Sequence, residues 1–198
     1  MKSYFQLWID DCSTVAAVFG VRPMYRAPFQ MIGEPLMADI GEAHSRVWPD
    51  LMRTNQFTVS LFSERWVIAA SEQKWTGIEF WPVKIREIDS KYLSSKPHPP
   101  YYWAKPIGKK GTNGLPNTGD DIKPDPSTGH FQRPKDSPRE AWVDSFVGEE
   151  TDFFYLSNIW APYIFCSERI RNTAIKQRWI NVDFAPSGKD DNGSFFVI

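Results

Sequence analysis

The stretch that decides the fold is LFSERWVIAASEQKWTGIEFWPVKI, from Leu61 to Ile85. From Phe57 into this stretch, apolar and polar residues alternate, which is typical of a β-strand. Ser63 then stands where a helix N-cap belongs, because its hydroxyl can accept a hydrogen bond from a free backbone N–H of the first turn. Glu64 follows, and its negative charge suits the positive end of a helix. The stretch therefore predicts a strand that leads directly into a helix.

The end of this helix is also marked in the sequence. Gly77 can adopt the left-handed backbone conformation that ends helices, so the helix is expected to stop near Trp75. The following residues, Ile78 to Ile85, alternate again and predict a second strand. Pro82 lies within that strand and favours an edge or a bulge, because proline lacks a backbone N–H. The unit as a whole is strand–helix–strand.

A second, degenerate copy of this unit lies 104 residues further on, at the distance from Ser63 to Ser167. Without a gap, the same offset gives these identical pairs: Ser63/Ser167, Glu64/Glu168, Arg65/Arg169, Ala70/Ala174, Gln73/Gln177, Trp75/Trp179, Phe80/Phe184 and Pro82/Pro186. Asn181 replaces Gly77, and asparagine is the next residue type to tolerate the left-handed conformation. Upstream, Pro49–Met52 corresponds to Thr151–Leu156 if two residues are inserted. The repeat predicts an α+β fold in which two strand–helix–strand halves share a mixed sheet.

The repeat also decides how the Ser-Glu-Arg triplet is interpreted. A single active site does not need the same three residues in equivalent positions of two halves. The triplet recurs together with its helix, its stop signal and the strand that follows. We therefore predict that it starts a helix rather than forming a reactive group.

The domain organisation follows from the spacing of the two copies. We expect a single domain over 1–198, with a first unit at about 47–86, a second at about 151–187 and a proline-rich excursion at about 94–140 between them. Nine prolines and five glycines lie between Pro97 and Glu140, so this stretch is predicted to be a long loop, ordered in part where Tyr101–Trp103 can pack. Further strands are expected at Tyr4–Ile9 and after an Asn-Gly turn near the C-terminus.

Composition excludes several classes of protein. The chain of 198 residues is 41% hydrophobic, 24% charged and 15% aromatic, which is typical of a globular protein rich in aromatics. Its formal net charge of -1 argues against a nucleic-acid binder that relies on overall basicity. Cys12 and Cys166 lie too far apart to indicate a disulfide scaffold. The start lacks a signal-peptide pattern, and the apolar run Val15–Gly20 is too short to span a membrane, so a cytoplasmic protein is expected.

A search for catalytic motifs is mostly negative. The sequence contains neither a G-x-S-x-G elbow nor H-E-x-x-H, and GKKGTNG (Gly108–Gly114) lacks the Gly-Lys-Ser/Thr ending of a phosphate-binding loop. His98 and His130 share the central loop with several aspartates, but their spacing is not that of metal ligands. Cys166 aligns with Phe62 of the other copy, which predicts burial. We expect no catalytic residue, no metal and no cofactor.

Adjacent acidic residues recur along the chain and have more than one interpretation. They could act as general acids, begin solvated turns, or form a surface that mimics phosphates for a basic partner. Neighbours in an extended chain point to opposite sides, so adjacency is poor support for a catalytic pair. The pairs are Asp10/Asp11, Asp120/Asp121, Glu149/Glu150 and Asp190/Asp191.

The repeated segments resemble a known family. FSERWVIAASEQKWTGIEFWPVKI (Phe62–Ile85) resembles the pattern V-S-E-R, helix, T-G-V-E-F-x-P-V of bacterial immunity proteins encoded with polymorphic toxins. DFFYLSNIWAPYIFCSERIRNTAIKQRWINVDFAP (Asp152–Pro186) resembles the C-terminal part of the related double-CXXCG motif proteins. The cysteine pairs that bind zinc in those relatives are absent, since the chain has 2 cysteines in total.

The resemblance implies that the protein neutralises a toxin by binding it, without catalysis. The toxin would act in the cytosol, and neither nucleic acid nor a membrane is expected as a partner. The predicted contact residues are Tyr101, Tyr102 and Trp103, with Asp120 and Asp121 as charge partners. The alternative for the three aromatic residues is that they fasten the loop to the core.

Two other functions remain open from the residues alone. One is a small hydrolase or transferase with a cleft between the halves, completed by the central loop. The other is a regulatory scaffold that binds a partner unrelated to toxins.

Overall fold

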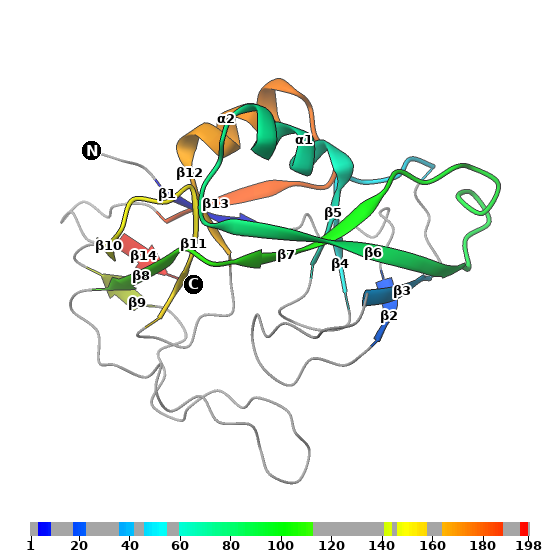
Figure 1. The fold of residues 1–198 in the computed structure, drawn as a ribbon, viewed down its shortest axis with the longest axis horizontal. Helices are drawn as coiled ribbons and strands as arrows, with labels where there is room; N and C mark the ends of the chain where they lie inside the picture. The colour runs from blue at the N-terminus through cyan, green and yellow to red at the C-terminus, as the bar shows by residue number, and fades with distance from the viewer. Residues whose placement is uncertain are drawn as a thin grey trace, which may run out of the picture.

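The structure is a computed structural model that describes residues 4–8, 18–22, 36–41, 46–54, 60–112, 141–143, 146–157, 164–187 and 195–197. These residues form an α+β fold of two mixed sheets with two short helices (Figure 1). The predicted fold class is confirmed, but the prediction that both halves share a single sheet is wrong. Each helix unit is built into its own sheet. The two units meet through side chains and through backbone hydrogen bonds, from Asp50 N–H to Ile180 O and from Phe153 N–H to Thr76 O.

The first sheet contains the first strand–helix–strand unit. Its strands are β2 (Val18–Arg22), β3 (Leu36–Ile40), β4 (Leu51–Arg53), β5 (Ser60–Ser63), β6 (Ile78–Ile88) and β7 (Tyr101–Pro106). Their spatial order is β2-β3-β6-β7-β5-β4, and β3 runs parallel to β6 while the other neighbours are antiparallel. Pro82 lies just before the pairing of β3 with β6 begins at Val83, so only β7 pairs with β6 at the proline. This local edge accommodates its missing N–H.

The second sheet contains the second unit. Its strands are β1 (Tyr4–Trp8), β8 (Lys109–Thr112), β10 (Phe146–Gly148), β11 (Phe153–Leu156), β12 (Phe165–Ser167) and β13 (Asp183–Ser187), in the order β10-β8-β11-β12-β1-β13. β8 runs parallel to β11. A separate antiparallel pair joins β9 (Ala141–Val143) to β14 (Phe195–Val197), which ties the C-terminal strand into the fold as predicted.

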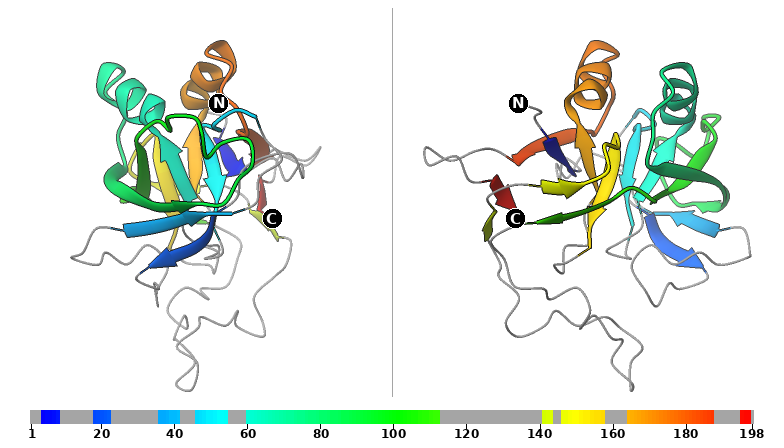
Figure 2. Two further views of the ribbon diagram at one scale, coloured as in Figure 1. Left: turned by 90° about the vertical axis from the view of Figure 1, so that its right-hand side faces the viewer. Right: turned by 60° about the vertical axis from the view of Figure 1, so that its left-hand side comes forward.

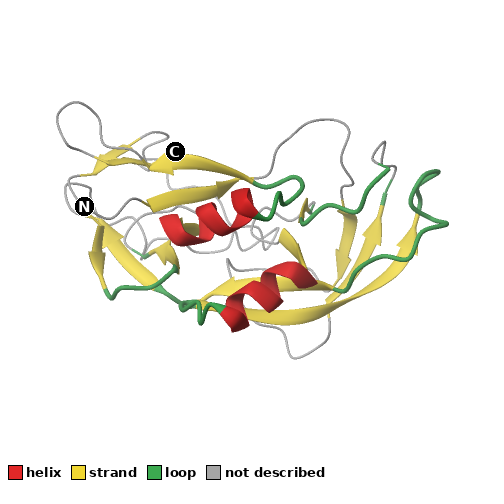
Figure 3. Ribbon diagram, turned by 90° about the horizontal axis from the view of Figure 1, so that it is seen from above, coloured by secondary structure: helices red, strands yellow, loops and turns green. Residues whose placement is uncertain are grey.

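The two helices follow the predicted repeat. α1 (Glu64–Glu72) connects β5 to β6, and α2 (Glu168–Lys176) connects β12 to β13. The helices start at positions 104 residues apart, the offset expected from the sequence. They lie side by side on the same side of the molecule (Figure 3).

The N-terminal strand completes the second half, which the sequence did not indicate. β1 lies between β12 and β13, with Tyr4 opposite Ser167 and Ser187. β7 lies in the same way between β5 and β6, with Tyr101 opposite Ser63 and Val83. Both halves therefore contain an equivalent antiparallel set of four strands, β6-β7-β5-β4 and β13-β1-β12-β11. The right-hand view of Figure 2 shows the blue strand β1 beside the orange strands of the second half.

Both helices end with the same hydrogen-bonded turn, but not at the residue predicted. Lys74 and Arg178 have positive φ angles of 51° and 53° and follow the C-cap residues Gln73 and Gln177. In α1, Lys74 N–H donates to Ser71 O and the following N–H, of Trp75, donates to Ala70 O. This is the Schellman motif, and α2 repeats it. Gly77, at φ 83°, takes the left-handed conformation expected of it, but in the connection to β6.

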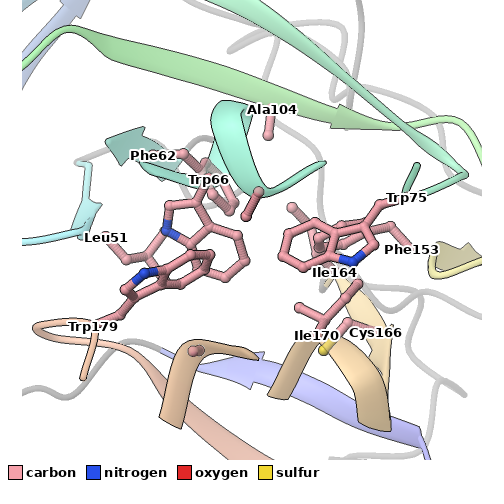
Figure 4. Packing of buried hydrophobic residues seen from close by; sticks show 12 residues of the cluster. Leu51, Phe62, Trp66, Trp75, Ala104, Phe153, Ile164, Cys166, Ile170 and Trp179 are labelled. Atoms are coloured by element: carbon pink, nitrogen blue, oxygen red, sulfur yellow. The ribbon is translucent and has the colours of Figure 1, made fainter. Parts of the chain in front are cut away.

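The main hydrophobic core lies where the two halves meet. Half of its buried residues come from each unit: Leu51, Phe62, Trp66, Ala69, Trp75 and Ala104 from the first, and Phe153, Ile164, Cys166, Ile170, Ala174 and Trp179 from the second. Trp66 and Trp179 pack with ring centroids 4.2 Å apart, and Trp75 packs against Phe153 at 5.8 Å (Figure 4). The halves thus share one core although they do not share a sheet.

A second core cluster belongs to the first sheet alone. It contains Leu36, Ala38, Ile40, Met52, Leu61, Leu93, Tyr101 and Trp103. Its last two members come from the predicted proline-rich loop, whose described part includes β7 and β8. The prediction of a loop over 94–140 is therefore wrong for Tyr101–Thr112, and 113–140 lies outside the described residues.

In the part of the chain that the structure describes, neither helix has the length and apolarity needed to cross a membrane.

Candidate functional site

Each half contains an aspartate that binds the serine and the arginine of its Ser-Glu-Arg triplet. In the first half, Ser63 Oγ donates to Asp50 Oδ1 at 2.7 Å and Arg65 Nη1 donates to Asp50 Oδ2 at 2.9 Å. We term this group of three residues the Asp50 station. The backbone N–H of Ser63 also donates to Asp50 O at 2.9 Å. Asp50 therefore fixes the start of α1 through hydrogen bonds to Ser63 and Arg65.

The Asp152 station repeats this arrangement in the second half. Ser167 Oγ donates to Asp152 Oδ1 at 3.0 Å, and Arg169 donates to both carboxylate oxygens through Nε and Nη2. The backbone N–H of Ser167 donates to Asp152 O at 2.8 Å. The two stations are thus built from the same residue types in the same roles.

The stations correct the predicted role of the serines. Ser63 and Ser167 occupy the N-cap positions, as predicted, but neither side chain caps the helix. Each hydroxyl instead donates to the neighbouring aspartate. The hydrogen bond from the serine hydroxyl to the aspartate carboxylate is charge-assisted. Such a bond is stronger than the neutral bond that the hydroxyl would accept from a backbone N–H as a cap.

Each station also reaches across to the other half. Arg65 Nη2 donates to Gln177 O at 2.6 Å, at the end of α2. Arg169 donates to Gln73 O and Lys74 O, both at 3.2 Å, at the end of α1. Each arginine therefore satisfies carbonyl groups that the other helix leaves unpaired at its C-terminus.

The carboxylates receive hydrogen bonds from the opposite half as well. The backbone N–H of Ile180 donates to Asp50 Oδ2 at 2.8 Å, and that of Thr76 donates to Asp152 Oδ2 at 2.9 Å. Each half therefore contributes the same contact to the aspartate of the other half, so the two stations are related by an approximate two-fold symmetry. Both aspartates are committed to structure, which agrees with the structural interpretation of the triplet.

The environment of Asp152 lowers the pKa of its carboxyl. Burial alone would raise the pKa of its carboxyl, but hydrogen bonds from Arg169, from the Thr76 amide and from Ser167 together hold that pKa below its ordinary value. A carboxyl whose pKa is lower in the folded state contributes stability above its unfolded pKa. That contribution is lost as the pH falls through the folded pKa.

We expect Asp152→Asn to lower the free energy of unfolding at pH 7 by about 2 kcal/mol, because the carboxylate that Arg169 and Ser167 bind loses its charge. Below about pH 4 the difference from the unsubstituted protein should begin to shrink, because the carboxyl of Asp152 then becomes protonated in the unfolded state, and it should disappear as the pH falls through the lower pKa of the folded state. Urea unfolding between pH 3 and pH 7 measures both effects. A difference that stays constant across this range would contradict the assignment.

A pocket opens beside the Asp152 station. Its volume is about 330 Å³, and its lining residues are Tyr4, Thr76, Glu150, Thr151, Asp152, Ser167, Glu168 and Arg169. They come from β1, from the connection after α1, from the segment before β11 and from the start of α2. The pocket therefore brings together both halves and the N-terminal strand.

A second surface feature is the part of the first sheet that extends beyond α1. Tyr102 and Pro82 are direct cross-strand partners in β7 and β6, and neither is buried. Met37, 36% exposed, is paired with Lys84, two residues beyond Pro82. Residues at this spacing share one face of a sheet. We term Met37, Pro82, Lys84 and Tyr102 the open sheet face.

The open sheet face has a charged border. On the same face of β6 and β3, Arg86 forms a two-pronged ion pair with Asp39. Hydrogen bonds to Asp39, together with the negative charge of Asp39, raise the pKa of Arg86 above its ordinary value. Apolar and aromatic side chains with a polar rim are typical of protein-binding surfaces.

The structure divides the predicted contact residues. Tyr101 and Trp103 are 1% and 2% exposed and lie in the core, and Tyr101 Oη donates to Pro49 O at 2.7 Å. They fasten the chain to the core, which is the alternative that the sequence left open for these aromatic residues. Tyr102 points to the opposite face and remains a candidate. Asp120 and Asp121 lie outside the described residues.

The remaining chemical candidates show structural roles or lie outside the described residues. Cys166 is fully buried, and burial, with the charge of Asp152, raises the pKa of its thiol. His98 is exposed and lies near the ring of Trp48. Cys12 and His130 fall outside the described residues. Among the residues that the structure describes, no three His, Cys, Asp or Glu side chains form a group able to hold a metal ion.

Sequence reasoning missed Asp50 and Asp152 as key residues. The signal was present, because the alignment of Pro49–Met52 with Thr151–Leu156 pairs these two aspartates. Their partners lie 13 and 15 residues further along the chain, and the different distances hid the shared role.

Comparison with known proteins found neither a family model nor a curated protein that matches the chain.

Proposed function

We propose that the protein is a cytosolic immunity protein that binds and neutralises a bacterial toxin, without catalytic activity of its own. The proposal is supported by the resemblance of Phe62–Ile85 and Asp152–Pro186 to immunity proteins encoded with polymorphic toxins. The structural observation that carries it is the open sheet face, which includes Tyr102.

Tyr102 has the features of an interface anchor. Its backbone is held on both sides, by Phe62 in β5 and Pro82 in β6, so the ring is presented from a rigid strand. Tyrosine combines a large apolar area with a polar tip and loses little side-chain entropy on binding. A rigid aromatic residue beside exposed Pro82 can therefore supply much of a partner's binding energy.

The join between the halves favours binding over the alternative of a hydrolase or transferase. That alternative places a cleft between the halves, where Trp66, Trp75 and Trp179 instead pack closely. The carboxylates nearest the join, Asp50 and Asp152, already accept several hydrogen bonds each. These observations support a protein that acts through its surface.

Co-expression tests the proposal. The toxin encoded beside this gene should stop growth of a susceptible bacterium, and expression of this protein should restore growth. If growth stays arrested although the folded protein accumulates, the proposal is wrong.

We expect Tyr102→Ala to weaken binding of that toxin about 30-fold, because truncation of an aromatic anchor typically costs about 2 kcal/mol. Titration calorimetry measures the change. Trp81→Ala is the control, since Trp81 is an aromatic residue of the neighbouring strand β6 that is 43% exposed but lies on the opposite face of the sheet. A greater loss of affinity for the control than for Tyr102→Ala would place the interface elsewhere.

A further inference from the structure

The first part of β6 has a neighbouring strand on one side only. β3 lies beside the C-terminal part of β6 and pairs with it from Val83 onward (Figure 1). Among the residues that the structure describes, β7 is therefore the one strand that pairs with Ile78–Pro82. Glu79 and Pro82 are exposed there. We term the side of Ile78–Pro82 that faces away from β7 the β6 edge.

The register with β7 shows which backbone groups point outward at the β6 edge. Ile107 N–H donates to Gly77 O at 2.9 Å, and these two residues continue the register of Ile78 opposite Pro106. Hydrogen-bonded and non-hydrogen-bonded pairs alternate along an antiparallel ladder. The N–H and C=O groups of Ile78 and Phe80 therefore point away from β7. In the part of the chain that the structure describes, these groups have no hydrogen-bond partner.

The second half blocks the equivalent edge with a side chain of its own. Phe184 in β13 is the counterpart of Phe80 in the repeat. Leu7 lies opposite Phe184 and donates its N–H on the side of β12, so the N–H of Phe184 also points outward. Asp183 Oδ1 accepts a hydrogen bond from that N–H at 2.7 Å. Glu79 replaces Asp183 in the first half, and the N–H of Phe80 has no such bond to a described residue.

The β6 edge is short because it is bounded at both ends. β3 occupies the edge from Val83 onward, and Gly77 lies so close to Phe153 that a Cβ would come 2.1 Å from the carbonyl oxygen. At about 3.3 Å per residue, Ile78–Pro82 offers a length of about 17 Å. The same edge of a second copy does not fit. Antiparallel pairing about Phe80 would place Gly77 of that copy opposite Val83, where β3 already lies.

We propose that a short extended segment of the protein's partner adds to the β6 edge as a further strand. The inference rests on the proposed function for the identity of that partner as a toxin, and it names the form in which the toxin binds. The main chain of an added strand supplies acceptors and donors for the outward groups of Ile78 and Phe80. Phe80 and Pro82 lie on the same side of the sheet as Tyr102, so the added strand is continuous with the open sheet face.

Charge indicates one side chain of the partner segment. Lys84 is exposed on the open sheet face and has no ion pair among the described residues, whereas Arg86 on the same face is paired with Asp39. The charge that remains on this face is therefore positive. We expect the segment to carry an acidic residue toward Lys84 and an apolar residue against Pro82.

Amide hydrogen exchange, followed by NMR in the full-length protein without toxin, tests whether the edge is open. The N–H groups of Glu79 and Trp81 point toward β7 and serve as internal controls. We expect the amides of Ile78 and Phe80 to exchange at least about tenfold faster than these controls, because they lack a partner. Equal protection of Phe80 and Trp81 would show that the edge is already covered and would overturn the inference.

The same measurement is repeated with the toxin encoded beside this gene, in an inactive form. Binding should slow the exchange of Ile78 and Phe80 to the level of their neighbours. Binding with unchanged exchange at both amides would overturn the inference and leave the proposed function standing. A toxin that does not bind the folded protein would overturn the proposed function, and the inference with it.

Glu79→Asp places in the first half the residue that blocks the edge of the second half. Its carboxylate should accept a hydrogen bond from Phe80 N–H, slow the exchange of that amide and weaken toxin binding about fivefold, the typical contribution of one hydrogen bond. Glu79→Gln is the control and should leave the exchange of Phe80 unchanged. Far-UV circular dichroism checks that both variants are folded. Slower exchange of Phe80 in Glu79→Asp without weaker toxin binding would overturn the inference.

Discussion

Replacing Trp66 with alanine is expected to lower the free energy of unfolding by about 4 kcal/mol, the cost of removing a large buried aromatic side chain. Trp66 is fully buried, and its ring packs against Trp179 and Phe153 of the other half, with centroids 4.2 Å and 6.3 Å away. Its Nε1 donates to Asp50 O at 2.9 Å, so the variant also leaves a carbonyl group without its partner. Among the residues that the structure describes, no other helix residue both packs in the shared core and donates a side-chain hydrogen bond to Asp50 or Asp152 from that core.

Urea unfolding followed by circular dichroism measures this effect. Ile68→Ala is the matched control on the same helix, because Ile68 is 49% exposed and should change the free energy of unfolding by less than about 0.5 kcal/mol. A single transition is expected for the unsubstituted protein, since both halves contribute to one core. If Trp66→Ala loses less than about 1 kcal/mol, the ring does not have the packing role assigned to it.

Replacing Gly77 with alanine is expected to cost about 3 kcal/mol, from the left-handed backbone and from steric overlap together. A Cβ at Gly77 would lie 2.1 Å from the carbonyl oxygen of Phe153, which belongs to the second half. Gly77 O also accepts hydrogen bonds from the N–H groups of Ile107 and Gly108, where the chain crosses from β7 to β8. The glycine thus permits a close contact of three backbone segments.

Asn181→Gly provides the comparison, because Asn181 occupies the equivalent place with φ 62°. Its Nδ2 donates to Leu51 O at 2.8 Å, so glycine there removes one hydrogen bond and should cost only about 1 kcal/mol. Thermal unfolding of both variants tests the contrast. Equal losses for Gly77→Ala and Asn181→Gly would mean that the close contact at Phe153 does not limit the side chain at position 77.

The repeat in the sequence allowed some of the left-handed residues to be predicted, but not all of them. Glycine and asparagine were correctly interpreted as residues that adopt a left-handed conformation at equivalent places. The sequence did not reveal that Lys74 and Arg178 end the helices, because a positively charged residue gives no local signal for a positive φ. That conformation is imposed by the connection to the next strand.

The strand–helix–strand units could be predicted because they are local. Their hydrophobic alternation and helix boundaries lie within about 30 residues, the length typical of one supersecondary unit. The place of β1 could not be predicted, since its partner β12 lies at the other end of the chain. The separation into two sheets depends on the same long-range pairing, so the single shared sheet was a natural but wrong expectation.

The candidate site was predicted less well than the fold. The sequence named Tyr101, Tyr102 and Trp103 alike as contact residues, whereas the structure leaves Tyr102 partly exposed and buries the other two. Alternation along a strand places neighbours on opposite faces, but the sequence alone gives no indication that this proline-rich stretch is a strand. The pocket beside the Asp152 station is formed by β1, the connection after α1 and the start of α2 together, and no local sequence pattern contains all three.

The proposed function is the binding of a toxin through the folded surface of the protein. The most direct measurement is a calorimetric titration of the purified protein with the toxin encoded beside its gene, in an inactive form. We expect one toxin per protein and a dissociation constant in the nanomolar range, which corresponds to about -12 kcal/mol. The absence of binding by a protein that unfolds cooperatively, and is therefore folded, would contradict the account.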